Sequence, residues 1–431
     1  MNQTTDKFKL IVTGIFAFFV LLGLVAFSTY KSTSTTTTTA TINVWGTIDK
    51  IVFDNYINKY KQDKILDFKL AYTQKSLDTI DSELVEAIAT GKAPDAILIP
   101  HTLIRRYLDK VYPITSIPTR TFLDTFVQES ELYIQPDGSL FGLPFFIDPM
   151  VMYWNRDMYS SAGIANPPTK WTEFPLLAEK ISKSDNNANI TKSAVAFGKY
   201  NNINNAKALL STLIMQAGCP IVYSENGRYV SRLDYQSSSD LMVPAESALQ
   251  FYTDYSNPKK SVYSWNGSLP SSKQSFLSRD LATYFGFASE YTDIKEKNPN
   301  LNFDVAAIPQ IVNAQKKTTF GELYGFAILK SSQNATQAYS LLLSLIGYDS
   351  VSTFLKFADV APARRDLISN GSIDSAKSVF YNSALISSSW MDPDSNKTDE
   401  IFKNMIENVT SGKMNVKDSV SEAGLELGNL L

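Results

Sequence analysis

Histidine and cysteine, two residue types that often carry catalysis or bind metals, are scarce in this chain. Its 431 residues include one histidine, His101, and one cysteine, Cys219. A single histidine excludes a multi-histidine metal centre, and a single thiol excludes an intrachain disulfide. Cys219 lies in an apolar stretch, where a small buried hydrophobe is the simplest interpretation. Hydrolytic chemistry would need a pair of carboxylates, and Asp148 with Glu322 is the pair to test.

Aromatic residues, by contrast, are abundant, with 22 Tyr, 25 Phe and 5 Trp. Trp265 and Trp390 stand in the polar segments SVYSWNGS and SSSWMDPDS, where a purely structural tryptophan has little to bury. We interpret both as ligand contacts, with local packing as the alternative. Asp148 interrupts the apolar run 145–155, so its carboxylate must be hydrogen-bonded or face a ligand.

The composition fits a folded protein of two domains or lobes. A hydrophobic fraction of 44% and a charged fraction of 19% exclude global disorder, and 431 residues exceed one ordinary core. The net charge of -3 gives no basic patch for nucleic acid, so we expect no nucleic-acid partner.

The first folded elements alternate between strands and helices. We predict strands over 42–46, 67–71 and 96–99, separated by helices over about 50–60 and 81–90. This alternation predicts an α/β fold with a parallel sheet and flanking helices. Ligands of such sheets bind at the carboxyl ends of the strands, and this rule selects Trp45, Thr47 and His101.

Later elements follow the same kinds of pattern. We predict helices over 205–217, 245–256, 335–346, 350–357, 399–409 and 416–425, and strands over 281–286, 303–308 and 321–329. Asp392, Asp394 and Asn396 imitate the start of a calcium loop, but Lys397 and Lys403 replace the glycine and glutamate that such a loop needs. We therefore expect a turn and a helix cap there, and no metal site or cofactor.

The N-terminus has the pattern of a membrane anchor. Residues 10–27 form an uncharged apolar run preceded by Lys7 and Lys9, which predicts a cytosolic segment 1–9 and a single-pass helix or signal segment. We favour an uncleaved anchor over a cleaved signal. The Ser/Thr-rich segment 28–41 is typical of a solvated tether that holds the rest of the chain outside the cell membrane.

Several motifs in order resemble the family 1 extracellular solute-binding proteins of ABC transporters, the group that includes maltose-binding protein. The most specific is DGSLFGLPFFIDPMVMYWNRDMYSSAGIANPPTKWTEF, residues 137–174. Further matches are LVEAIATGKAPDAILI (84–99), LNFDVAAIPQ (301–310), YGFAILKSSQN (324–334) and PARRDL (362–367). The resemblance covers about residues 42–430.

This resemblance implies a periplasmic-binding-protein-like fold of two α/β lobes with a hinge and a ligand cleft between them. Lobe one would hold 42–147 and 305–365, and lobe two 148–304 and 366–431. Sugars present C–H faces and hydroxyls, so their sites combine aromatic surfaces with fixed polar groups. The candidates at lobe-facing positions are Trp45, Phe146, Trp265, Tyr284, Tyr324 and Trp390 for stacking, and Thr47, Asp148, Glu322 and Arg364 for hydrogen bonds.

The resemblance implies a monomeric, non-enzymatic protein that captures a sugar or oligosaccharide and delivers it to ABC permease subunits. Two alternatives of the binding class stay open at this point: a surface-tethered glycan sensor or adhesin without a transporter, and an importer component for a polyamine or a glycerol phosphate. The third alternative is an enzyme that cleaves polysaccharides with Asp148 and Glu322.

Overall fold

The computed structural model describes residues 40–64, 68–187, 189–225, 228–236, 243–312, 314 and 316–431. The expected cytosolic segment 1–9, the anchor 10–27 and nearly all of the tether 28–41 lie outside these residues. Among the helices that the structure describes, none is both long enough and apolar enough to cross a membrane.

The chain begins its fold with the predicted alternation of strands and helices. The elements are β1 (Thr41–Gly46), α2 (Lys50–Lys64), β2 (Lys69–Gln74), α3 (Ile80–Ala89) and β3 (Ala96–Pro100). β1 runs parallel to β3, with Val44 opposite Ala96. β3 is buried along its whole length, as expected for a central strand covered on both faces, so this part of the prediction is confirmed.

A single sheet path runs through the described part of the fold in the order β2-β1-β3-β11-β4-β9-β6-β5. Its later strands are β4 (Leu143–Asn155), β5 (Lys183–Ser184), β6 (Ile190–Val195), β9 (Leu281–Phe287) and β11 (Thr319–Ile328), and β10 (Phe303–Ala306) pairs with β4 off this path. The short strands β12 (Ala361–Pro362) and β13 (Ser387–Ser388) pair with β4 and β11, and β7 (Val222–Glu225) pairs with β8 (Arg228–Ser231) as a separate hairpin.

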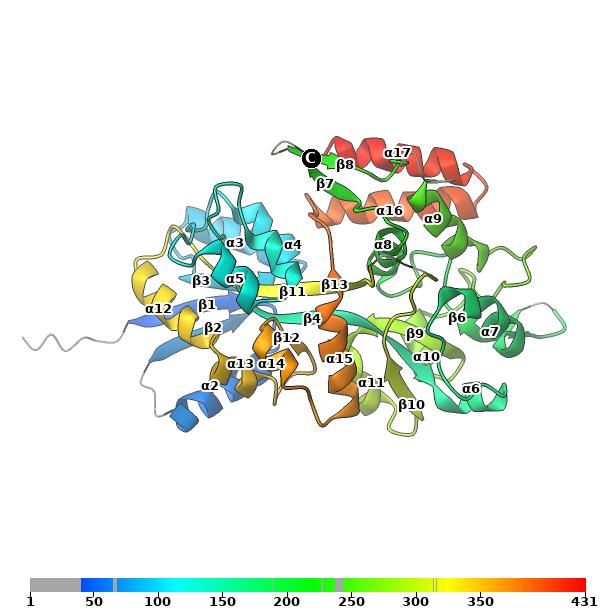
Figure 1. Cartoon of the computed structure of the whole chain (residues 1–431), viewed down its shortest axis with the longest axis horizontal. Helices are drawn as coiled ribbons and strands as arrows, with labels where there is room; N and C mark the ends of the chain where they lie inside the picture. Colours follow the sequence, from blue (N-terminus) through cyan, green and yellow to red (C-terminus); the bar gives the residue numbers. More distant parts are fainter. Residues whose placement is uncertain are drawn as a thin grey trace, which may run out of the picture. The chain divides into compact units, whose positions relative to one another are not determined.

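Helices divide into two groups around this sheet (Figure 1). Around β1 to β3, which we call the β1 side, lie α2, α3, α4 (His101–Ile104), α5 (Thr119–Thr125), α12 (Ala335–Leu345), α13 (Tyr348–Phe354) and α14 (Arg365–Ser369). Around β6, β9 and β10, which we call the β9 side, lie α6 (Arg156–Ser161), α7 (Phe174–Ile181), α8 (Ala206–Gln216), α9 (Pro244–Asp254), α10 (Ser272–Leu277), α11 (Tyr291–Lys297), α16 (Ser395–Thr410) and α17 (Val416–Gly428). Helix α15 (Ser375–Leu385) lies between the two groups. Short 3-10 turns complete the fold: η1 (Arg105–Tyr107), η2 (Gln128–Tyr133), η3 (Trp171–Glu173) and η4 (Ala288–Glu290).

The strand β4 joins the two sides because its two halves have different neighbours. Its residues up to Pro149 pair antiparallel with β11. From Met150 onward it pairs with β9, and its end pairs with β10. All 13 residues of β4 are buried, which accounts for the long apolar run in the sequence.

Many of the abundant aromatic side chains form the core on each side. On the β9 side the ring of Phe197 stacks on Phe285 with centroids 5.5 Å apart. On the β1 side Phe146 stacks on Tyr324 at 4.6 Å, with Phe354 packed against Phe146. Aromatic pairs of this kind stabilise a core beyond the burial of their area, so the aromatic content of the sequence is largely structural.

Candidate functional site

A cavity of about 620 Å³ opens between the two sides at the ends of the β2 and β3 strands. The β1 side contributes the loop from Leu77 to Asp81 and the turn from Pro100 to Arg106. The β9 side contributes residues of two segments: 200–208, which leads into α8, and 390–399, which leads into α16. The cavity lies near the carboxyl ends of β2 and β3, but none of the three residues that the strand-end rule selected, Trp45, Thr47 and His101, belongs to its lining.

Four aromatic side chains line this cavity: Tyr200, Phe287, Phe320 and Trp390. The indole N–H of Trp390 donates to the hydroxyl oxygen of Ser211 at 3.1 Å, and its ring stacks on Phe402. These contacts fix the orientation of the indole before any solute binds. A rigid aromatic surface is what a site needs in order to stack against an apolar face.

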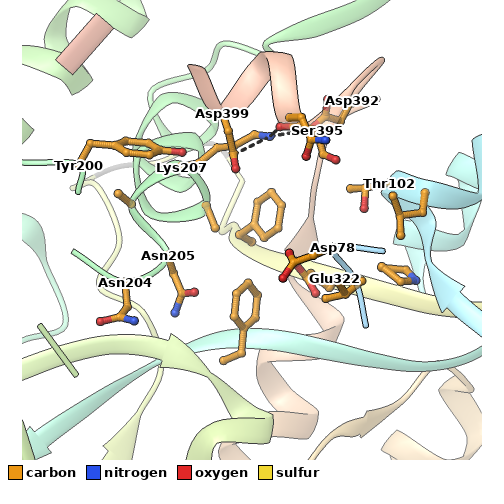
Figure 2. Close-up of a pocket in the computed structure, with 18 of the residues that line it drawn as sticks. Asp78, Thr102, Tyr200, Asn204, Asn205, Lys207, Glu322, Asp392, Ser395 and Asp399 are labelled. Atoms are coloured by element: carbon orange, nitrogen blue, oxygen red, sulfur yellow. Dashed lines mark hydrogen bonds and ion pairs between the residues drawn. The ribbon is translucent and has the colours of Figure 1, made fainter. Parts of the chain in front are cut away.

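The ammonium group of Lys207, in the first turn of α8, is fully engaged by the segment that leads into α16. It donates to Asp392 at 2.7 Å and lies 3.1 Å from Asp399 (Figure 2). It donates a further hydrogen bond to the hydroxyl of Thr398 at 2.7 Å. It also lies 5.6 Å from the centre of the Trp390 ring. Lys207 therefore pairs with two aspartates of the lining, and the three groups together keep a formal charge of -1.

The second cation of the lining, Arg106, is engaged in the same way. Its Nη1 lies 2.9 Å from Asp81 on the β1 side, and its Nη2 lies 2.6 Å from Asp394. The hydroxyl of Tyr107 donates to the other oxygen of Asp81 at 2.6 Å. Asp394 also caps α16 by accepting from the backbone N–H groups of Asn396 and Lys397, which confirms the cap predicted in place of a calcium loop.

The lining carries more carboxylates than cations. Asp78, Asp81, Glu322, Asp392 and Asp399 face two cations, Lys207 and Arg106, a formal balance of -3. Lys207 and Arg106 pair with three of these carboxylates, Asp81, Asp392 and Asp399. Glu322 accepts a hydrogen bond from the hydroxyl of Tyr324 at 3.3 Å, and burial raises its pKa. The cavity therefore presents negative potential and hydrogen-bond acceptors to a solute.

A loop of asparagines, residues 201–205, forms the wall of the cavity on the β9 side. Asn204 accepts from the backbone N–H of Lys273 at 3.1 Å, and Asn205, at φ 60°, donates to Glu290 at 3.1 Å. Asparagine tolerates the left-handed conformation better than most residues, which suits this position. The sequence analysis missed this loop, although the run NNINN was the visible signal.

Two of the residues predicted from the sequence, Glu322 and Trp390, line the cavity. The other nine lie outside its lining: Trp45, Thr47, His101, Phe146, Asp148, Trp265, Tyr284, Tyr324 and Arg364. Trp45 and Thr47 are half-buried at the end of β1, and the Lys75 ammonium lies 3.9 Å from the Trp45 ring. Phe146 and Tyr324 stack on each other in the core.

The polar atoms of several of these nine residues are satisfied within the fold. The indole of buried Trp265 donates to Asn202 at 3.1 Å, and the hydroxyl of buried Tyr284 donates to Glu290 at 2.8 Å. Arg364 pairs with Asp366 at 2.7 Å.

The two buried ionisable residues of the set, His101 and Asp148, lie beside the cavity. Nδ1 of His101 accepts from the backbone N–H of Leu323 at 3.2 Å, and burial lowers its pKa to about 4. The ring is therefore neutral, and its Nε2–H donates to the hydroxyl of Ser389 at 2.7 Å. Asp148 accepts from the backbone N–H of Ser289 at 3.0 Å, and burial raises its pKa to about 8.

An α/β fold with two sides that share one sheet, and with a solute-sized cavity between them, is the architecture of a solute-binding protein. A family model of bacterial extracellular solute-binding proteins matches residues 55–380. This match covers more than half of the chain, and the chain belongs to this family.

Curated relatives are matched over part of their length. Proteins of Brucella abortus (strain 2308) and Brucella suis biovar 1 (strain 1330), each described as a candidate binding protein, are 25% identical over 251 residues. This match covers 57% of the chain, and the chain spans 55% of the length of each relative. The sn-glycerol-3-phosphate-binding periplasmic protein of Agrobacterium fabrum is 37% identical over 54 residues, 12% of each protein.

A solved structure of a cyclo/maltodextrin-binding protein complexed with maltotetraose has the same fold. The TM-score is 0.73 at 16% identity, and the match covers 90% of this chain and 96% of the other. At this identity the likeness shows the fold alone, and it confirms the predicted α/β architecture.

Proposed function

We propose that the protein is the extracytoplasmic solute-binding component of an ABC importer. It captures a sugar or oligosaccharide in the cavity and delivers it to permease subunits in the membrane. The observation that carries this proposal is the cavity itself, which combines four aromatic side chains with many fixed polar groups. Sugar rings offer apolar faces and hydroxyls to such a lining.

A neutral carbohydrate fits the lining better than an anionic solute does. A phosphate group needs cations or free N–H donors, but Lys207 and Arg106 each already pair with two aspartates. Asp78 and Glu322 would also repel an anion. A glycerol phosphate is therefore disfavoured, although one of the matched relatives binds it. A polyamine is the second candidate, since the same two carboxylates would attract it.

The proposed lobes are 42–147 with 305–365, and 148–304 with 366–431. They agree with the two sides of the sheet except after residue 365, where α14 (Arg365–Ser369) still lies on the β1 side. β4 crosses from one side to the other next to Asp148, and Glu322 of β11 lies opposite this point. Bending at these crossings would close the cavity around a solute. The segment 10–27 would anchor the monomeric protein, with its bulk outside the membrane on the tether 28–41.

The same geometry supports binding rather than catalysis. A glycosidase needs two carboxylates that both face the substrate, and only Glu322 of the candidate pair lines the cavity. Asp148 is buried and accepts from Ser289. The family is one of binding proteins, in agreement with this proposal.

The test is thermal unfolding of residues 41–431, which contain the compact unit 42–431, against neutral mono- and oligosaccharides, polyols, sn-glycerol 3-phosphate and polyamines. A solute at 100 times its Kd should stabilise the fold by about 2.7 kcal/mol. We expect a carbohydrate to shift the midpoint. If only spermidine shifts the midpoint, the solute is a polyamine and not a sugar. If only sn-glycerol 3-phosphate shifts it, the inference that the lining disfavours anions is wrong.

Delivery to a permease needs a separate experiment in cells that carry the gene. Uptake of the radiolabelled solute should fall when the gene is deleted and recover with the full chain. Unchanged uptake, combined with solute binding in vitro, would favour the surface-tethered sensor or adhesin instead.

A further inference from the structure

The chain passes from the β1 side to the β9 side between two consecutive residues, Ser389 and Trp390. The backbone N–H of Ser389 donates to Glu129 on the β1 side at 2.9 Å, and its hydroxyl contacts Glu129 and His101. The indole of Trp390 donates to Ser211 of α8 on the β9 side at 3.1 Å. A bond between residues held to opposite sides is a natural pivot for hinge motion.

Residues beyond this pivot move with the β9 side. Lys207 of α8 holds Asp392 and Asp399 at 2.7 and 3.1 Å. Helix α16, which begins at Ser395, packs on α8, α9 and α17. Asp394, the cap of α16, is therefore part of the β9 side.

Arg106 lies on the β1 side and pairs with an aspartate on each of the two sides. It lies in η1, directly after α4, and its Nη1 is anchored to Asp81 at the start of α3, so its base belongs to the β1 side. Its Nη2 lies 2.6 Å from Asp394, and both side chains are mostly shielded from solvent, at 19% and 25% exposure. Moving the β1 and β9 sides apart would have to break this ion pair.

We propose that Arg106 is a positioning residue that acts as an ionic latch between the two sides and favours the closed cavity. The proposal rests on the proposed function, because closure matters only if a solute is captured. The latch is charge-assisted and bridges two carboxylates, one on each side, so its loss should shift the population toward open forms.

The direct test measures the separation of the two sides without any solute. Spin labels are placed on the full chain at exposed positions, Lys92→Cys on the β1 side and Lys413→Cys on the β9 side, in a Cys219→Ser background. We expect the wild type to give one main distance, and Arg106→Gln to add a longer population. Asp394→Asn should do the same, since asparagine still caps α16 while the charge is lost.

Three controls separate a latch from a general loss of structure. Arg106→Lys should restore most of the short distance, because lysine keeps the charge. Arg232→Gln removes a comparable ion pair, 3.2 Å from Glu225 on the β7–β8 hairpin, and should leave the distances unchanged. About 1 M salt should lengthen the wild-type distance and leave Arg106→Gln unaffected.

Identical distance distributions in the wild type and Asp394→Asn would overturn the latch, even if Arg106→Gln failed to fold. If the latch is correct, Arg106→Gln should also raise the rate of solute release by about fivefold to tenfold. The two proposals can be refuted independently of each other. If the variants change the distance but no carbohydrate binds, the sugar-binding proposal is wrong and the latch proposal stands. If a carbohydrate binds tightly but the variants leave the distances unchanged, the latch proposal is wrong and the sugar-binding proposal stands.

Discussion

Glu322 of β11 and Asp148 of β4 are register partners on adjacent strands, so their carboxyl groups share one face of the sheet where β4 crosses between the two sides. Glu322 lines the cavity, whereas Asp148 is buried behind it. Burial raises the pKa of both groups, and the neighbouring Glu322 charge raises that of Asp148 further. At this crossing, one carboxyl group with a raised pKa lines the cavity and a second lies directly beside it.

This pairing predicts how stability changes with pH. The pKa of Asp148 rises from its ordinary 3.8 to about 8 in the fold, so protonated Asp148 stabilises the folded state. That stabilisation is lost as the pH rises through about 8. We expect the midpoint of thermal unfolding to fall as the pH rises from about 4 to about 8 and to level off above that.

Asp148→Asn tests the assignment, because its amide oxygen can still accept from Ser289. The variant should unfold at a higher temperature than the wild type at about pH 9, and its decline with pH should be flatter. Asp137→Asn, at an exposed turn where hydrogen bonds from Ser139 lower the pKa, should leave the slope unchanged. Equal slopes for Asp148→Asn and the wild type would contradict the prediction.

The elements that were predicted well are those with a local signal. The β1 to β3 alternation follows from periodicity and turns within sixty residues. Arg106, Lys207 and the loop 201–205 were missed because polar residues acquire a common site only through long-range packing.

Two residues that the sequence predicts as ligand contacts are shaped by the same long-range packing. The sequence predicts Trp265 and Tyr284 as ligand contacts, partly because Trp265 has polar neighbours. In the fold, Asn202 accepts from the Trp265 indole across 63 residues, and long-range packing buries both rings. That either residue contacts a solute stays a prediction.

Tyr200 and Trp265 give opposite predictions for solute binding. Tyr200 is half-buried in the lining, so Tyr200→Ala should weaken binding of the carbohydrate that stabilises the fold by about twofold to tenfold, the usual range for one aromatic contact. Trp265→Phe keeps a ring in the core outside the cavity and should leave Kd unchanged by isothermal titration calorimetry. If only Trp265→Phe weakened binding, the solute would occupy a different place.

Glu322 should influence which charges the cavity accepts. For the wild type we expect glucose to compete for the bound carbohydrate better than glucose 6-phosphate does. Glu322→Gln removes one negative charge from the lining, and it should narrow this difference by roughly 1 kcal/mol, about fivefold. Glu131→Gln, at an exposed position of η2, is the matched control and should leave the ratio unchanged. A ratio that Glu322→Gln does not alter would mean that the solute does not approach this carboxylate.

The hydroxyl of Ser389 should contribute more to the free energy of unfolding than the hydroxyl of its neighbour Ser388. Its hydroxyl and N–H both contact buried Glu129, and burial raises the pKa of that carboxyl to about 7. Ser389→Ala deprives Glu129 and the Nε2–H of His101 of a partner, which should cost about 1–3 kcal/mol in urea unfolding. Ser388→Ala, at a half-buried position of β13 where the backbone pairs with β11, should cost less than about 0.5 kcal/mol.

Because the lost hydroxyl leaves the Glu129 carboxylate less satisfied, the deficit of Ser389→Ala should grow as the pH rises through about 7 and Glu129 ionises. A deficit that stays constant from about pH 5 to pH 8 would show that the hydroxyl does not support the charged form of Glu129.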